Sequence, residues 1–175
     1  MIVDFPGPES WPAWSPDGLQ IAFNSNGPQG SDRLAIWTVS RERVGDAWGD
    51  PVRLTDFRCI FPDWAPDGES LVCGAGSELV IVSKTGEAVT RFDPQMPSRK
   101  PRFSPDGSEV YFLVLSGPAP GVWSFPVTGG EATQLVAFDD PSLSVLDFVL
   151  TVGPDRFYLT ISEYESDIYV MDLEY

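Results

Sequence analysis

Carboxylates are the side chains with the most scope for chemistry, because the sequence has 26 acidic residues and no histidine. Without histidine, the chain alone cannot supply a Ser-His-Asp or Cys-His triad or a histidine-ligated zinc. Two cysteines are too few for a four-thiolate zinc site. The sequence also lacks a nucleophile elbow, a phosphate-binding glycine-rich motif and an EF-hand loop. We therefore predict no catalytic residue, no metal site and no cofactor.

Two groups of carboxylates are dense enough to examine for catalysis. They are Asp139 with Asp140, and Glu163 with Glu165 and Asp167. Carboxylates about 5–9 Å apart can hydrolyse glycosidic bonds, and oxygen-rich loops can bind calcium. Both groups fall in expected surface connections, where acidic residues are common. A carbohydrate-active enzyme is therefore the least favoured of the functions that we weigh.

Basic side chains gather in the connections that lead into two of the expected sheets. Arg58, Arg99, Lys100 and Arg102 all lie there, although the chain has only 11 basic residues. Asp63 and Arg102 each stand directly before an aromatic residue at matching places, so we expect both to approach a central channel. We predict that this face binds a partner or ligand. The alternative is that these cations merely balance nearby acidic residues.

The element that must position these side chains is a turn that occurs four times, at intervals of 39 to 50 residues. Proline presets φ at the first corner, aspartate bonds its own backbone, and glycine accepts a positive φ. We therefore give a structural role to Asp17, Gly18, Asp67, Gly68, Asp106, Gly107 and Asp155. The copies are Trp14-Ser15-Pro16-Asp17-Gly18, Trp64-Ala65-Pro66-Asp67-Gly68, Phe103-Ser104-Pro105-Asp106-Gly107 and the degenerate Val152-Gly153-Pro154-Asp155-Arg156.

Short apolar runs surround each turn and predict antiparallel strands. The second strands are expected at 21–23, 71–73, 110–112 and 157–159, and the third at 36–39, 79–82, 122–125 and 168–171. Fourth strands are expected at 52–55, 88–92 and 132–136. A four-stranded unit repeated every 40 to 50 residues is typical of a propeller blade. The predicted fold class is all-β, a β-propeller of four four-stranded antiparallel blades.

The aromatic-Ser-Pro-Asp-Gly turn, with the later turn Thr128-Gly129-Gly130-Glu131, resembles the TolB-type repeat, a WD-like β-propeller repeat of bacterial proteins. The resemblance covers nearly the whole chain, but Gly153 and Arg156 depart from the pattern. It implies a non-catalytic binding module, a scaffold or sensor for a protein or peptide. It equally allows an accessory domain of a hydrolase or peptidase that gates substrate access. A typical TolB-like parent would be periplasmic or extracytoplasmic.

We expect one propeller domain over residues 1–175. Residues 1–5 would be the outer strand of a preceding or closing blade. The blades would span 6–56, 57–93, 94–138 and 139–175, the last without its outer strand. The four blades would be half of a larger ring, completed by another copy through self-association or by missing upstream blades, since bare edges and apolar faces invite pairing.

Charge and composition exclude several classes of partner. The net charge of −15 repels phosphate backbones, so no nucleic-acid partner is expected. No apolar window is long enough for a membrane span, so no membrane insertion is expected. The blade faces should be held by Trp14, Trp37, Trp64, Phe103, Phe112, Trp123, Phe148, Tyr158 and Tyr169.

Cys59 and Cys73 flank the second turn. Pairing around that turn would place Cys73 opposite about Phe61, which leaves Cys59 two residues out of register. Because a disulfide requires Cα atoms within about 7 Å, we do not expect one here. We predict that Cys73 is a core residue and leave Cys59 unassigned.

Overall fold

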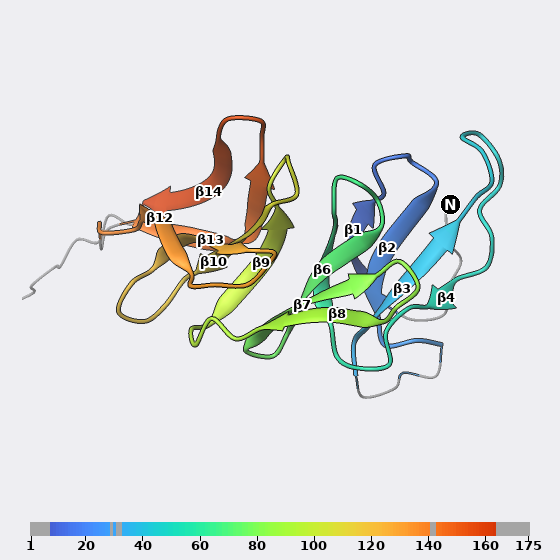
Figure 1. The fold of residues 1–175 in the computed structure, drawn as a ribbon, viewed down its shortest axis with the longest axis horizontal. Coiled ribbons are helices and arrows are strands. Elements are labelled where there is room, and N and C mark those ends of the chain that lie inside the picture. Colours follow the sequence, from blue (N-terminus) through green and yellow to red (C-terminus); the bar gives the residue numbers. More distant parts are fainter. Residues whose placement is uncertain (1–7, 29, 31–32, 141–142, 164–175) are drawn as a thin grey trace, which may run out of the picture.

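The structure is a computed structural model that describes residues 8–28, 30, 33–140 and 143–163. These residues form fourteen β-strands, arranged as three four-stranded sheets and one two-stranded sheet. The sheets follow one another side by side in chain order (Figure 1). The all-β propeller fold predicted from the repeated turn is therefore confirmed.

Each sheet is a meander of consecutive antiparallel strands, and we call the sheets blades 1 to 4. Blade 1 contains β1 (Glu9–Trp14), β2 (Gln20–Ser25), β3 (Ala35–Ser40) and β4 (Val52–Arg53). Blade 2 contains β5 (Ile60–Trp64), β6 (Ser70–Ala75), β7 (Glu78–Ser83) and β8 (Ala88–Phe92). Blade 3 contains β9 (Ser98–Phe103), β10 (Glu109–Val114), β11 (Gly121–Pro126) and β12 (Thr133–Ala137). Blade 4 contains β13 (Leu143–Val152) and β14 (Phe157–Glu163).

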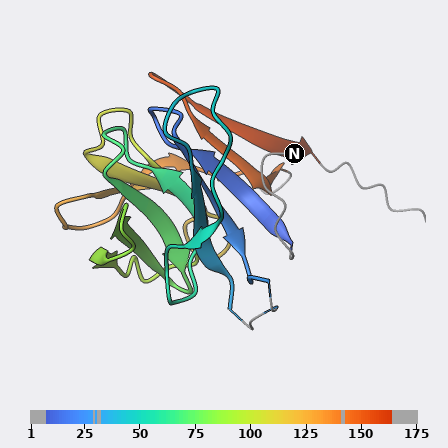
Figure 2. The same ribbon diagram turned by 90° about the vertical axis from the view of Figure 1, so that its right-hand side faces the viewer.

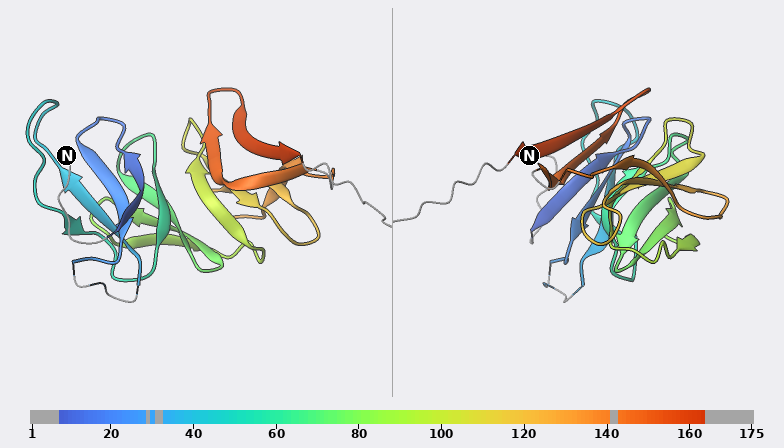
Figure 3. Two further views of the ribbon diagram at one scale, coloured as in Figure 1. Left: turned by 180° about the vertical axis from the view of Figure 1, so that it is seen from behind. Right: turned by 90° about the vertical axis from the view of Figure 1, so that its left-hand side faces the viewer.

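Two of the expected strands lie outside the described residues: the outer strand at 1–5 and the third strand of blade 4 at 168–171. Blade 1 lies nearest the viewer in Figure 2, and blade 4 in the right-hand view of Figure 3. Within the described part of the chain, no helix could cross a membrane.

The repeated turn forms as its residues predict. In the first copy, Gly18 has φ +70° and its N–H donates to the Ser15 carbonyl, at 2.9 Å. The Asp17 carboxylate accepts hydrogen bonds from the Ser15 hydroxyl and from the Leu19 N–H, at 2.6 and 2.9 Å. The third copy repeats this pattern around Asp106. These local bonds hold the first two strands of a blade in register.

Blade 2 is apolar on both faces because it lies between blade 1 and blade 3. Successive residues of a strand point to opposite faces. Leu71 packs with Ala22 and Ile36 of blade 1, whereas its neighbour Val72 packs with Phe112 of blade 3. Both Leu71 and Val72 are fully buried. This explains why the second strand reads as a continuous apolar run rather than an alternating one.

The junctions of blade 1 with blade 2 and of blade 2 with blade 3 repeat one contact. Trp64 of blade 2 is buried and its Nε1–H donates to the Ala13 carbonyl of blade 1, at 3.2 Å. Gly68 lies against Pro16, since a Cβ on Gly68 would be 3.7 Å from the proline Cδ. Phe103 of blade 3 is likewise buried, and Gly107 lies against Pro66. Turn and aromatic therefore join a blade to the one before it.

Of the predicted core aromatics whose side chains the structure describes, five pack in the core and two are exposed. Trp64, Phe103 and Phe112 are buried, and Trp37 and Trp123 pack partly buried against core clusters. Trp14 and Tyr158 are instead 52% and 54% exposed. No described blade packs on Trp14 in the way that blade 1 packs on Trp64. Phe148 and Tyr169 fall outside the residues whose side chains the structure describes.

Blade 1 carries a local clip beside the exposed Trp14. The Arg41 guanidinium donates to the Gly18 carbonyl, at 2.9 Å from Nη2, and lies 4.6 Å from the Trp48 ring centroid. Trp48 in turn makes an edge contact with Trp14 at 5.5 Å. Phe23 is buried in the same blade. The clip belongs to the long β3–β4 connection, and it covers Trp14 only in part.

Cys59 and Cys73 form a disulfide, so our expectation was wrong. Their Cα atoms are 5.6 Å apart and both residues are fully buried. The register explains the difference. Ile60 pairs with Gly74 and Asp63 with Val72, so two β5 residues oppose Cys73 alone. Such a bulge bends the strand, which brings Cys59 within reach of Cys73.

Trp64→Ala should lower the free energy of unfolding by about 3–5 kcal/mol, because it removes a buried indole that joins two blades. Urea unfolding followed by circular dichroism measures the change. Trp64→Phe keeps a buried ring and loses the bond to Ala13 together with part of the indole volume, so it should cost clearly less than Trp64→Ala. Equal stability of Trp64→Ala and the wild type would show that the junction is not held by this side chain.

Ser104→Ala should raise the pKa of Asp106. In the wild type, hydrogen bonds from Ser104 Oγ, the Ser108 N–H and Ser108 Oγ hold this pKa at about 2. Because the folded-state value lies below the ordinary one, the carboxylate stabilises the fold above pH ~4, and this stability is lost as pH falls toward 2. On acidification, the variant should therefore unfold at a higher pH than the wild type does.

Carboxyl 13C NMR titration measures the pKa of Asp106 in both proteins. Asp17 provides an internal control, since its pKa is lowered by its own bond to Ser15, which the substitution leaves intact. An unchanged Asp106 titration in Ser104→Ala would contradict the assigned cause.

Candidate functional site: the hollow between the inner strands

The inner strands β1, β5 and β9 lie next to one another and share an irregularity. Each contains a bulge, located at Trp11, Phe61 and Lys100. These three residues have φ of +51°, +60° and +54°, the left-handed region that non-glycine residues rarely adopt. A proline follows each of them. The repeat therefore places three strained residues at equivalent positions of three blades.

The side chains of these three residues meet in space. The Trp11 and Phe61 rings have centroids 4.4 Å apart, in an edge contact. Lys100 Nζ lies 4.1 Å from the Phe61 centroid and 5.2 Å from that of Trp11. Phe61 and Lys100 are buried, and Trp11 is 38% exposed. A lysine is thus enclosed between two aromatic rings, an arrangement that stabilises the ammonium by cation–π attraction.

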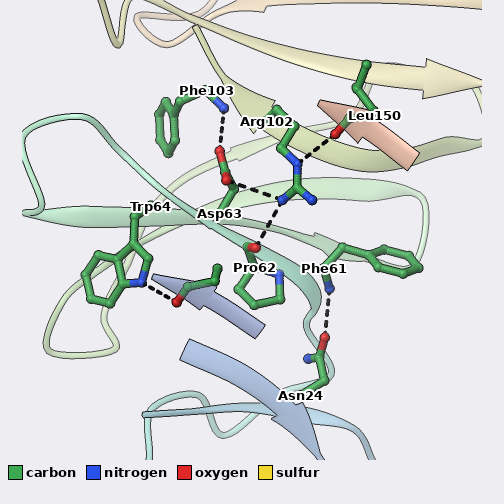
Figure 4. Close-up of polar contacts among 9 residues, drawn as sticks. Asn24, Phe61, Pro62, Asp63, Trp64, Arg102, Phe103 and Leu150 are labelled. Carbon is green, nitrogen blue, oxygen red and sulfur yellow. Dashed lines mark hydrogen bonds and ion pairs between the residues drawn. The ribbon is translucent and has the colours of Figure 1, made fainter. Parts of the chain in front are cut away.

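Asp63 and Arg102 lie in the wall of the same region and form an ion pair, at 3.3 Å from Oδ1 to Nη1 (Figure 4). The other Asp63 oxygen accepts the Phe103 N–H, at 2.9 Å. Arg102 also donates to the Pro62 carbonyl at 3.3 Å and to the Leu150 carbonyl at 3.1 Å. Arg102 therefore links blades 2, 3 and 4 through one side chain.

Burial raises the pKa of Asp63 above its ordinary value, although the Arg102 guanidinium and the Phe103 N–H both lower it. About a quarter of each side chain of the pair remains exposed. The ion pair consequently supports the packing of the blades while it presents polar atoms to solvent inside the hollow.

Three cavities surround these residues. The first, about 300 Å³, is the axial hollow, and its lining combines Pro12, Ala13 and Trp14 of β1 with Asp63, Arg102, Phe103, Thr151 and Val152. The second, about 200 Å³, is lined by Trp11, Pro12, Phe61, Pro62, Lys100 and Arg102. The third, about 180 Å³, includes Arg58, Phe61, Pro97 and Arg99 in its lining. Residues from all four inner strands thus enclose the axial hollow.

The structure distributes the sequence-predicted site residues over these cavities. Asp63 and Arg102 line the axial hollow. Lys100 and Arg102 line the second cavity, and Arg58 and Arg99 line the third. Whether any of the five binds a partner stays a prediction.

Trp11 and Phe61 are the site residues that the sequence reasoning missed. A signal for them exists, because each blade from 1 to 3 has a proline two residues before the turn aromatic. The segments are Trp11-Pro12-Ala13-Trp14, Phe61-Pro62-Asp63-Trp64 and Lys100-Pro101-Arg102-Phe103. A proline inside a strand indicates a bulge or an edge.

Asp139 and Asp140 are the carboxylates examined for catalysis whose side chains the structure describes, and neither lines these cavities. Asp63 alone among acidic residues lines the axial hollow, and the second and third cavities have no acidic lining residue in the described part of the chain. Glu165 and Asp167 lie outside the described residues. Across residues 8–28, 30, 33–140 and 143–163, no cluster of His, Cys, Asp or Glu is suited to hold a metal ion.

Solved structures with similar folds include TolB proteins. TolB from Acinetobacter baumannii aligns with a TM-score of 0.60 and 20% identity, over 90% of this chain and 41% of that one. A protein of Agrobacterium tumefaciens assigned as a TolB aligns with a TM-score of 0.58 and 18% identity, over 94% and 73%. The fold is a TolB-type β-propeller. A chain of a nidogen/laminin complex has a similar propeller, with a TM-score of 0.59 and 12% identity over 77% of this chain and 50% of that one.

A curated relative is similar in sequence to part of this chain. It is the uncharacterized peptidase YuxL of Bacillus subtilis, 30% identical over 112 residues. The alignment covers 63% of this chain and 16% of the relative's length. The chain thus spans a small part of the relative, and no protein-family model matches it.

Proposed function

We propose that this TolB-type propeller is a non-catalytic binding module, a scaffold or sensor that holds a protein or peptide in the axial hollow. The observation that carries the proposal is the hollow itself, which residues of all four inner strands enclose. Its lining combines Trp14, Phe103 and Pro12 with one arginine, Arg102, which pairs with Asp63. Aromatic residues and arginine are enriched in protein-binding surfaces. The nidogen/laminin structure is an example of a similar propeller within a protein complex.

A second candidate function is an accessory domain that gates substrate access in a peptidase. The similarity to part of YuxL favours it. In that case the hollow would select extended peptides on their way to a catalytic domain elsewhere in the parent protein. The parent reading frame separates the two candidates, because a hydrolase domain in it would support gating and a membrane-bound kinase would support sensing.

Thr151→Trp tests the axial hollow. Thr151 is exposed on β13 and lines the hollow, so an indole there should fill it without removing a core contact. Dodecapeptides selected from a random displayed library against the wild-type chain should bind at least tenfold more weakly to this variant. Isothermal titration measures the affinities.

The matched control is Thr133→Trp, at an exposed position of the outer strand β12. It should leave the same peptides bound as in the wild type. Peptides that bind Thr151→Trp and wild type equally, or a library that yields no binder, would contradict the proposed site.

We also propose that a second copy of the chain covers the exposed Trp14 and so continues the row of blades. Support comes from the repeat, because Trp64 and Phe103 occupy the same position and both are buried by the preceding blade. Trp14 is 52% exposed, which leaves a large aromatic surface available for the same kind of contact.

Sedimentation at graded concentrations tests this second-copy contact. The wild type should show a dimer that dissociates on dilution, and Trp14→Glu should remain monomeric because it places a charge in the contact. Val89→Glu, at an exposed position of the outer strand β8, is the control. A stable wild-type monomer near 19.2 kDa at every concentration would refute the proposal.

A further inference from the structure

The junction between blades 3 and 4 departs from the other two junctions and contains a fourth cavity, of about 290 Å³, which we call the junction cavity. Its lining comes from both blades and is mostly apolar. It includes Pro105, Tyr111 and Leu135 of blade 3 and Val152, Arg156 and Phe157 of blade 4. The junction cavity and the axial hollow have only Val152 in common. They are therefore two different places at which a ligand could bind.

A shorter turn is one cause of the junction cavity. The Ser104 N–H of the third turn donates to the carbonyl of Glu109, five residues later, at 2.9 Å. The Gly153 N–H of the fourth turn donates to the carbonyl of Arg156, only three residues later, at 2.8 Å. The fourth turn also lacks the glycine that packs against a proline at the other two junctions. Pro105 is therefore left as a wall of the cavity.

The second cause is an exchange of large and small side chains across the junction. Val152 stands where the second and third turns have the buried aromatics Trp64 and Phe103. On the facing blade, Tyr111 stands where blade 2 has the smaller Val72, because each of them pairs with the residue before the turn aromatic of its own blade. A valine leaves space that an indole or phenyl ring would fill. Tyr111 consequently becomes an aromatic wall of the cavity.

The walls and the size of the junction cavity define an aromatic ligand. Tyr111 and Phe157 make an edge contact, with ring centroids 5.0 Å apart, and Leu135, which is 44% exposed, lines the same cavity. An apolar cavity of about 150 Å³ can hold benzene, so about 290 Å³ is room for two fused rings. Aromatic rings also gain edge or stacked contacts beyond the area that they bury. A ring system of indole size matches both features.

The charges around the junction cavity disfavour an anionic ligand. Asp155 forms an ion pair with Arg156, at 2.8 Å from Oδ2 to Nη2, so the arginine in the lining is already paired. Burial raises the pKa of the Tyr111 hydroxyl, and the carboxylates of Glu109 and Asp106 raise it further. Both these neighbouring carboxylates and the net charge of −15 repel a negative charge on a ligand.

We propose that the junction cavity binds a ring system of indole size that carries no negative charge. Tyr111 and Phe157 supply aromatic contacts, and Pro105, Leu135 and Val152 supply aliphatic ones. The site goes beyond the proposed peptide site, because no residue of blades 1 and 2 takes part in it. A free small molecule and the tryptophan side chain of a peptide share this chemistry, and probes of both kinds distinguish the two sources.

Saturation-transfer NMR on the 175-residue chain tests the proposal. The probes are indole, tryptamine, indoleacetate and a capped tripeptide with a central tryptophan between two glycines. Indole and tryptamine should both bind, and indoleacetate should bind about tenfold more weakly because its carboxylate meets groups of like charge. A tripeptide that binds tighter than indole would assign the site to a peptide side chain. Indole that binds at least as tightly as the tripeptide would assign it to a free small molecule.

Two substitutions that fill the cavity from opposite sides locate the site. Leu135→Trp acts at a position that is 44% exposed, and Val152→Phe restores the aromatic residue of the other turns. Each should weaken indole binding at least tenfold. The matched control is Val136→Trp, on the next residue of β12, which is 38% exposed and does not line the cavity. It should change the affinity for indole less than twofold.

Several results would overturn the proposal. They are the absence of indole binding to the wild type, equal losses in Leu135→Trp and Val136→Trp, and tighter binding of indoleacetate than of indole. Thr151→Trp, which fills the axial hollow, should leave indole bound as in the wild type. A loss of indole in that variant would assign the ring to the axial hollow instead. Because the selected dodecapeptides report on the axial hollow alone, the binding module and the junction cavity can fail separately.

Discussion

The contact on which the fold depends is the packing of the second and third turns, with the aromatic residue of each, against the preceding blade. Gly107 shows how tight this contact is, because a Cβ there would lie 3.3 Å from Pro66 Cδ. The same glycine has φ +74°, so its lack of a side chain serves both the turn and the junction. One pentapeptide thereby closes a hairpin and joins two sheets. A chain that repeats this pentapeptide therefore places its successive sheets side by side.

The bulges of the inner strands connect this fold to the candidate site. At β5 the bulge brings Cys59 beside Cys73 and turns Phe61 toward Trp11 and Lys100. The disulfide closes a segment of the chain that contains both the bulge and the turn of blade 2. The strained backbone at Phe61 is consequently held from two directions, by the covalent link and by the packing of blades 1 and 3. Strain of this kind persists only where the surroundings determine the conformation.

The sequence was sufficient to predict the turns, because Pro, Asp and Gly act through their own backbone preferences. It was also sufficient to predict the strands of blades 2 and 3, where apolar runs such as 71–73 are buried on both faces of the sheet. It failed where the outcome depends on register or on neighbours. The cysteine pairing was judged from an unbulged hairpin, which puts Cys59 too far from Cys73. Trp14 was expected in the core because Trp64 is, yet burial of this position depends on a blade on its other side.

For a related reason, the sequence predicted only the charged residues of the candidate site. Arg58, Arg99, Lys100 and Arg102 attract attention in an acidic sequence, whereas Trp11 and Phe61 look like ordinary core aromatics. Both line the second cavity, and both have a positive φ that composition does not reveal. Arg102 further shows that a cation in a binding region can have a structural task, since it bonds to Pro62 and Leu150 as well as to Asp63.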